Sequence, residues 1–201
     1  MSPQEREQRV RTAFQKELNL IADPDLREFV VRAAGRLCQD SFWERPTSLT
    51  KKHHPKVMNK EPGGLVNHTR YAVMLGVHFC RMHGDGSENA NAVSPHQDIV
   101  VGALILHDMM KDGPTRESVS THGVDLANAI VRAFFPDGRG MSQKHMLLLY
   151  GVACHMGRWT EPKQYRPQNI QDPLCRHVAE VVHLADMAAA CKVDTFLEQL
   201  A

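Results

Sequence analysis

The sequence lacks the features that mark membrane and secreted proteins. No apolar run approaches the ~20 residues that a membrane-spanning helix needs. The charged stretch 1–20 has no apolar segment of the kind found in signal peptides. Lys and Arg total 24 and Asp and Glu total 23, so no charge excess favours a nucleic-acid or membrane surface as partner. We therefore expect a cytoplasmic protein with no membrane partner.

Cysteine occurs without the spacing of a metal site. The five cysteines are odd in number, and none forms a CxxC pair, which makes a cysteine-based zinc site unexpected. Four of them lie in apolar stretches, where cysteine usually behaves as a small hydrophobic residue. We therefore expect reduced, structural thiols, which fit an intracellular protein.

The chain also lacks strand patterns and internal repeats. Apolar residues recur at helical spacing instead, and 201 residues suit one domain. The predicted helices span about 2–21, 23–41, 65–83, 94–110, 120–135, 142–157 and 172–193. Residues 99–106 are apolar on all sides, which predicts a central buried helix. We expect an all-α, single-domain bundle of about seven helices, with residues 1–45 as an N-terminal extension packed on the core and residues 194–201 as a tail.

Histidine is abundant, with 12 residues, and it is the commonest metal ligand. Six His and Asp residues lie in or at the edge of predicted helices, and two of them close the most apolar helix, where an unpaired charge would be costly. Taken singly, a histidine at a helix end is more often a surface or capping residue, and an aspartate in an apolar helix can simply bond to a neighbour. Together they indicate a site for Mn, Fe, Co, Ni or Zn, the ions that suit histidine and carboxylate ligands. The six are His68, His107, Asp108, His122, His155 and Asp186.

Two of the residues in this part of the chain suit catalysis. Asp108 has two carboxylate oxygens and can bridge two ions, and a pair of ions about 3.5–4 Å apart can hold a hydroxide and clamp a phosphoryl oxygen. Lys111 follows one helical turn later, within reach of a phosphate over the ions. We expect Asp108 and Lys111 to be the catalytic residues.

Five segments resemble the HD-domain phosphohydrolase superfamily, in the order and spacing of that family. They are GGLVNHTRYAV (63–73), ALILHDMMKDG (103–113), STHGVDLA (120–127), ACHMGRW (153–159) and HLADMAAA (183–190). The run HHPK (53–56) before the Gly-Gly-Leu turn is similar to the HD domains of 3′–5′ exoribonucleases and related relaxases. The chain departs from the family at Asn67, where an acidic residue is common, and at Met156, where some members have a second histidine.

The resemblance implies an orthogonal helical bundle in which residues 46–193 form a metal-dependent phosphohydrolase domain. It implies that His68, His107, Asp108 and Asp186 surround one ion, and that His122 and His155 hold a second ion bridged by Asp108. The implied reaction is cleavage of a phosphoester of a nucleotide or related phosphodiester by a metal-bound hydroxide. Candidate substrate contacts are His54, Lys56, Lys111 and Arg158.

Several alternatives stay open at this point. They are a catalytically silent nucleotide-binding regulator, a nuclease- or relaxase-type protein that acts on nucleic acid, and a helical interaction module with incidental histidines. A small phosphate ester is the expected partner, and a homodimer is an open alternative. His183 shares a helix face with Asp186 and either contacts the site or is a surface residue. Trp159 either stacks on a base or packs locally.

Overall fold

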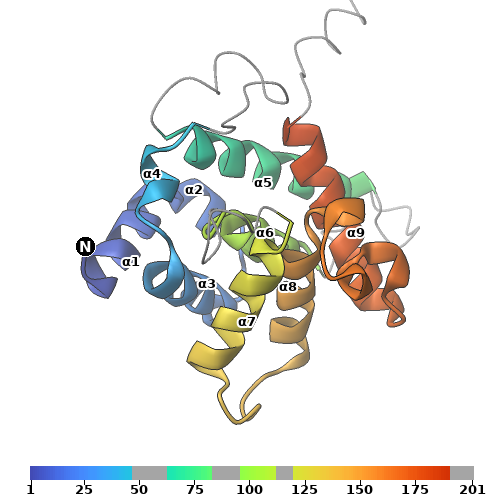
Figure 1. Ribbon diagram of the computed structural model, residues 1–201. Coiled ribbons are helices and arrows are strands. Elements are labelled where there is room, and N and C mark those ends of the chain that lie inside the picture. The colour runs from blue at the N-terminus through green and yellow to red at the C-terminus, as the bar shows by residue number, and fades with distance from the viewer. Residues whose placement is uncertain (47–62, 83–95, 112–119, 191–201) are drawn as a thin grey trace, which may run out of the picture.

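The computed structural model describes residues 1–46, 63–82, 96–111 and 120–190, and the described chain is all-helical (Figure 1). The predicted all-α fold is confirmed. The helices of ten or more residues in these ranges correspond one to one with the seven predicted helices. They are α1 (Pro3–Ala13), α3 (Pro24–Leu37), α5 (Gly64–Met82), α6 (Gln97–Leu106), α7 (His122–Phe134), α8 (Gln143–Cys154) and α9 (Pro173–Ala190).

Local sequence signals explain where several helices begin. Ser2 caps α1 in a capping box with Glu5, with Pro3 at the first helical position. The Asp23 carboxylate accepts hydrogen bonds from the backbone N–H groups of Asp25 and Leu26 at the start of α3. These starts agree with the predicted ones, because the cap residue and the proline act within a single helical turn.

Two predicted helices are divided in the structure. The first breaks at Phe14, whose backbone leaves the helical region, and resumes as the short helix α2 (Gln15–Leu18). The ring of Phe14 is fully buried and lies 6.3 Å from the ring of Phe42. The second predicted helix ends at Leu37, and α4 (Ser41–Glu44) follows separately. At the first break, burial of the Phe14 ring replaces a regular continuation of the helix. At the second, the backbone N–H of Gln39 bonds to the carbonyl oxygen of Met109.

The most apolar helix lies at the centre of the bundle, as predicted (Figure 1). Every residue of α6 from Ile99 to Leu106 is buried. Glycines allow its neighbours to approach closely. A Cβ on Gly76 of α5 would lie 2.4 Å from Cδ1 of Leu104, and a Cβ on Gly151 of α8 would lie 2.9 Å from the Cβ of Ala103. The central helix therefore packs closely against both α5 and α8.

The first four helices share one hydrophobic core with the rest of the described chain. Val10, Phe14 and Val30 belong to the same cluster of buried side chains as Leu104 and Leu148. The residues predicted to form the tail, 194–201, lie outside the described ranges. None of the helices in the described ranges combines the length and apolar character needed to cross a membrane.

The cysteines of the described chain are free thiols, and all of them are buried: Cys38, Cys80, Cys154 and Cys175. Burial raises the pKa of the Cys38 thiol to about 12, and burial together with the neighbouring Cys175 raises the pKa of Cys154 to about 12. These thiols therefore behave as small core residues.

The shared core generates a prediction for Phe14→Ala. Because the ring is fully buried among other aromatic rings, its removal should lower the free energy of unfolding by about 3–5 kcal/mol. Leu20→Ala is the control, because Leu20 is 37% exposed in the same N-terminal region and should cost under about 1 kcal/mol. Urea unfolding in chelator, followed by circular dichroism and tryptophan fluorescence, should show one transition at a lower midpoint. An unchanged midpoint for the main transition would mean that the first helices are a detachable extension.

Candidate metal centre

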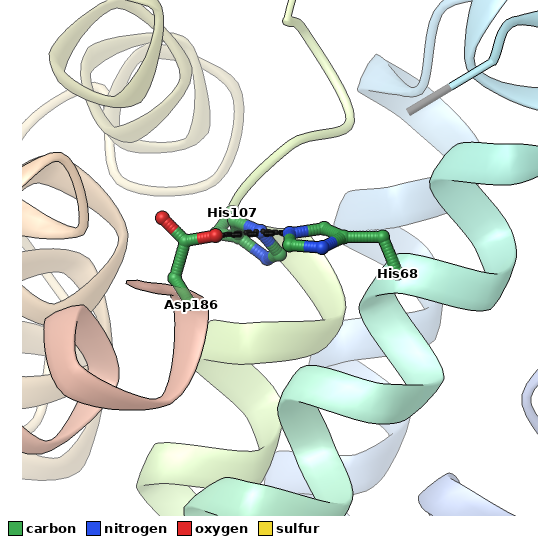
Figure 2. A group of neighbouring side chains, drawn as sticks. All are labelled: His68, His107 and Asp186. Carbon is green, nitrogen blue, oxygen red and sulfur yellow. Dashed lines mark hydrogen bonds and ion pairs between the residues drawn. The ribbon is translucent and has the colours of Figure 1, made fainter. Parts of the chain in front are cut away.

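Three side chains from three helices meet in a first His–His–Asp group (Figure 2). His68 extends from the first turns of α5, His107 caps the C-terminus of α6, and Asp186 comes from α9. Nε2 of His68 lies 2.9 Å from Oδ1 of Asp186, and Nε2 of His107 lies 3.4 Å from Nε2 of His68. Both histidines are buried, whereas the Asp186 side chain is 15% exposed. Three donor atoms from distant parts of the sequence therefore point toward one another.

A second group of the same composition lies beside the first. His122 is the first residue of α7, His155 caps the C-terminus of α8, and Asp108 follows α6. Nε2 of His122 lies 3.1 Å from Oδ1 of Asp108 and 2.9 Å from Nε2 of His155. All three side chains are at most 2% exposed. The rings of His107 and His155 lie 5.0 Å apart, so the two groups are neighbours.

Asp108 faces both groups with different oxygens. Its Oδ1 lies 3.1 Å from Nε2 of His122 and 3.7 Å from Nε2 of His155. Its Oδ2 lies 3.5 Å from Nε2 of His107 and 3.9 Å from Nε2 of His68. This arrangement is that of a carboxylate able to bridge two ions.

The two groups repeat one hydrogen-bond pattern. Nδ1 of His107 lies 2.6 Å from the carbonyl oxygen of Leu104, and Nδ1 of His155 lies 2.7 Å from that of Val152. Because a carbonyl only accepts, Nδ1 carries a proton in both rings, and in the neutral ring Nε2 then has the lone pair that can bind an ion. In each group, the Nε2 atoms of the two histidines and a carboxylate oxygen form a triangle with sides of 2.9–3.7 Å. A cation could bind among these three atoms.

The carboxylates of both groups are ionised. Burial disfavours the charge of Asp108, but the Lys111 ammonium and His107 outweigh burial and hold the pKa of Asp108 well below its ordinary value. Burial likewise opposes ionisation of Asp186, and interactions with His107 and His68 nonetheless hold its pKa well below the ordinary value.

The pKa values of His155 and His107 are shifted in opposite directions. Burial, together with the neighbouring His122 and His107, lowers the pKa of His155 to about 3, so its ring is neutral at neutral pH. Burial would also lower the pKa of His107, but the carboxylates of Asp108 and Asp186 outweigh it and raise the pKa. The site therefore combines two negative charges with a neutral His155, a donor set that attracts a cation.

Glycine allows the second group to assemble. A Cβ on Gly123 would lie 2.6 Å from the carbonyl oxygen of Val152 and 2.7 Å from Nδ1 of His155. These are the two atoms of the hydrogen bond that orients His155, so only glycine fits next to His122 at this crossing of α7 and α8. Sequence reasoning missed this requirement; its one signal was a glycine directly after a predicted ligand.

The residues predicted to contact substrate lie in different surroundings where the structure describes them. His54 and Lys56 lie outside the described residues. Nζ of Lys111 lies 2.5 Å from Oδ2 of Asp108, so its ammonium pairs with the carboxylate that joins the two groups. The Arg158 guanidinium lies 4.3 Å from the ring centroid of the exposed Trp159. His183 contacts the site, because its Nδ1 lies 2.7 Å from the carbonyl oxygen of His155.

The donor set fits divalent transition ions. Each group offers two imidazole nitrogens and one carboxylate oxygen, and the atoms within each group lie within 4.8 Å of one another. Such ligands suit Mn, Fe, Co, Ni or Zn. In the second group, three protein ligands leave a coordination position open, whereas Oδ2 of Asp108 offers the first group a fourth protein donor. The buried clusters can therefore hold metal ions.

Comparisons of the chain with protein-family models, with curated proteins and with solved structures found no match. The chemistry of the two groups therefore carries the functional argument.

The shared carboxylate makes Asp108→Asn a sharp test of the metal site. The amide keeps the size of the side chain but removes its negative charge from both groups, so bound Mn or Zn should fall to less than about a tenth of the wild-type content. Asp125→Asn is the matched control, since Asp125 lies on α7 and its carboxylate accepts a hydrogen bond from Thr121. Metal content after dialysis is measured by mass spectrometry. Full occupancy in Asp108→Asn, with circular dichroism unchanged, would contradict the assignment.

Proposed function

We propose that this protein is a metal-dependent phosphohydrolase of the HD-domain type, with one ion in each His–His–Asp group. The observation that carries the proposal is the position of Asp108, whose two oxygens face different groups. Two adjacent ions lower the pKa of bound water and offset the charge of a phosphoryl group. The resemblance of the motifs to HD domains and the open coordination of the second group both support this function.

The residues of the chain have distinct tasks in this proposal. The hydrogen bonds from Nδ1 of His107 and His155 to backbone carbonyls fix the tautomer in which Nε2 is the donor atom toward an ion. Asp108 holds the two groups at a fixed separation. Asp186 is the most exposed of the six side chains, which places the open side of the site near α9.

Lys111 supplies a partly exposed positive charge beside Asp108. Its side chain is 32% exposed, and its ammonium pairs with Oδ2 of Asp108. Bound ions would take over the neutralisation of Asp108, and the ammonium would then be able to contact a phosphoryl oxygen. In this proposal Lys111 acts on substrate, and its contact with Asp108 offsets one of the two carboxylate charges before ions bind.

The proposed substrate is a phosphoester of a nucleotide or a related phosphodiester. The resemblance to HD domains supports this class, and Arg158 stacked on the exposed Trp159 offers a cationic and aromatic surface a few residues beyond His155. Turnover of bis(p-nitrophenyl) phosphate, p-nitrophenyl phosphate and a panel of nucleotides by the Mn-loaded protein tests it. Nucleotide binding without turnover of any of these compounds would point to a regulatory domain instead.

Lys111→Ala should retain bound metal and lower kcat by roughly 10²–10³, the effect of removing one electrostatic stabiliser. Lys144→Ala is the matched control, because the Lys144 side chain is 33% exposed and pairs with Asp23 outside the site. Steady-state kinetics and metal analysis are made on the same samples. Unchanged turnover in Lys111→Ala would remove this lysine from the mechanism.

The double variant His122→Ala/His155→Ala tests the second ion. It removes both imidazoles of one group and leaves His68, His107 and Asp186 intact, so it should bind about one ion fewer per chain and lose nearly all turnover. Metal stoichiometry by calorimetry with Mn provides the measurement. A wild-type protein that never exceeds one ion per chain at saturation would rule out the binuclear site.

A further inference from the structure

His183 on α9 contacts the backbone of the residue that caps α8. Its Nδ1 lies 2.7 Å from the carbonyl oxygen of His155, and a carbonyl only accepts, so Nδ1 of His183 is the donor. His183 lies one helical turn before Asp186 on the same helix. This hydrogen bond therefore joins the helix that carries Asp186, of the first group, to His155, of the second.

The backbone after His155 adopts a conformation that leaves space for the His183 ring. Gly157 has a φ of +58°, a conformation that side-chain-bearing residues rarely adopt. A Cβ at Gly157 would also lie 2.2 Å from Cε1 and Nε2 of His183, so the ring packs directly against the glycine backbone. Both features require glycine here, and together they seat the His183 ring against the turn that follows His155.

The hydrogen bond forms at the C-terminus of α8, where the backbone carbonyl groups lack partners within the helix. His155 is the C-cap of α8, and the last carbonyl groups of a helix have no partner within the helix. The imidazole of His155 is tied to Val152 of the same helix, so the position of Nε2 follows the position of this final turn. A displaced carbonyl at His155 would move Nε2 away from His122 and Asp108.

We propose that His183 is a positioning residue, which holds the final turn of α8 so that Nε2 of His155 faces the second metal group. The hydrogen bond also makes α9 a link between the two groups, since one helix supplies Asp186 to the first and orients a donor of the second. The effect on metal affinity rests on the proposed function, whereas the effect on His155 itself does not.

Two variants of nearly equal shape separate the hydrogen bond from the volume of the side chain. In His183→Asn, the amide nitrogen takes about the place of Nδ1 and still donates. In His183→Asp, an ionised oxygen takes that place and faces the carbonyl with no proton to donate. His177→Asp is the control for added charge on α9, because His177 lies near the start of the helix and its ring contacts His96.

The first measurement uses metal-free protein. Nitrogen-15 NMR should show a slowly exchanging Nδ1–H signal for His155 in the wild type, in His183→Asn and in His177→Asp, and loss of that signal in His183→Asp. The second measurement is calorimetric titration with Mn. The affinity for the second ion should fall 10–100-fold in His183→Asp, the usual effect of removing a partner of a ligand, and should be retained in His183→Asn. An added carboxylate by itself would attract the cation, so weaker binding in His183→Asp would report displacement of His155 and not charge.

An unchanged His155 signal in His183→Asp would overturn the proposal, whatever the metal content. Loss of the signal in a protein whose wild type binds one ion would leave the positioning role in place and rule out the binuclear part of the proposed function. If His183→Asp does not fold, His183→Leu replaces it, since leucine fills space without a donor. Equal His155 signals in the leucine and asparagine variants would then overturn the proposal.

Discussion

The ionised carboxylate of Asp108, buried among four histidines, is the constraint on which the rest of the site depends. Such a charge is costly to bury unless it is neutralised and hydrogen-bonded. Here the neutralisation comes from the ammonium of Lys111, and the imidazoles of both groups surround the two oxygens. Because its two oxygens face different groups, the same carboxylate could also contact a cation in each of them.

Helix ends account for the arrangement of the histidines. α6 and α8 both end at a histidine of the site, and each ring donates Nδ1–H to a carbonyl in the last turn of its helix. The negative end of a helix dipole favours a cation, so these two termini would assist binding of a metal ion. α7 begins at His122 and has the opposite effect.

The helices were predictable to the extent that local signals define them. Ser2 with Pro3 and Asp23 with Pro24 mark helix starts that the structure confirms, because capping acts within one turn. The break at Phe14 was not predictable, since the local sequence permits a continuous helix and burial of the ring against Phe42 decides otherwise. The predicted extent of the central helix, 94–110, was also too long, since α6 covers Gln97–Leu106 and His107 is its C-cap.

The sequence by itself determined the helical class, the central buried helix and the set of six His and Asp residues, because apolar periodicity and polar residues in apolar segments are local properties. Only the tertiary structure decided how the six divide into two groups, which oxygen of Asp108 faces each group, and that Lys111 pairs with that carboxylate. The need for glycine at positions 123 and 157, and the reach of His183 to His155, were likewise decided there. These features arise where helices distant in sequence cross, and the spacing of residues along a chain does not specify the distance between two helices.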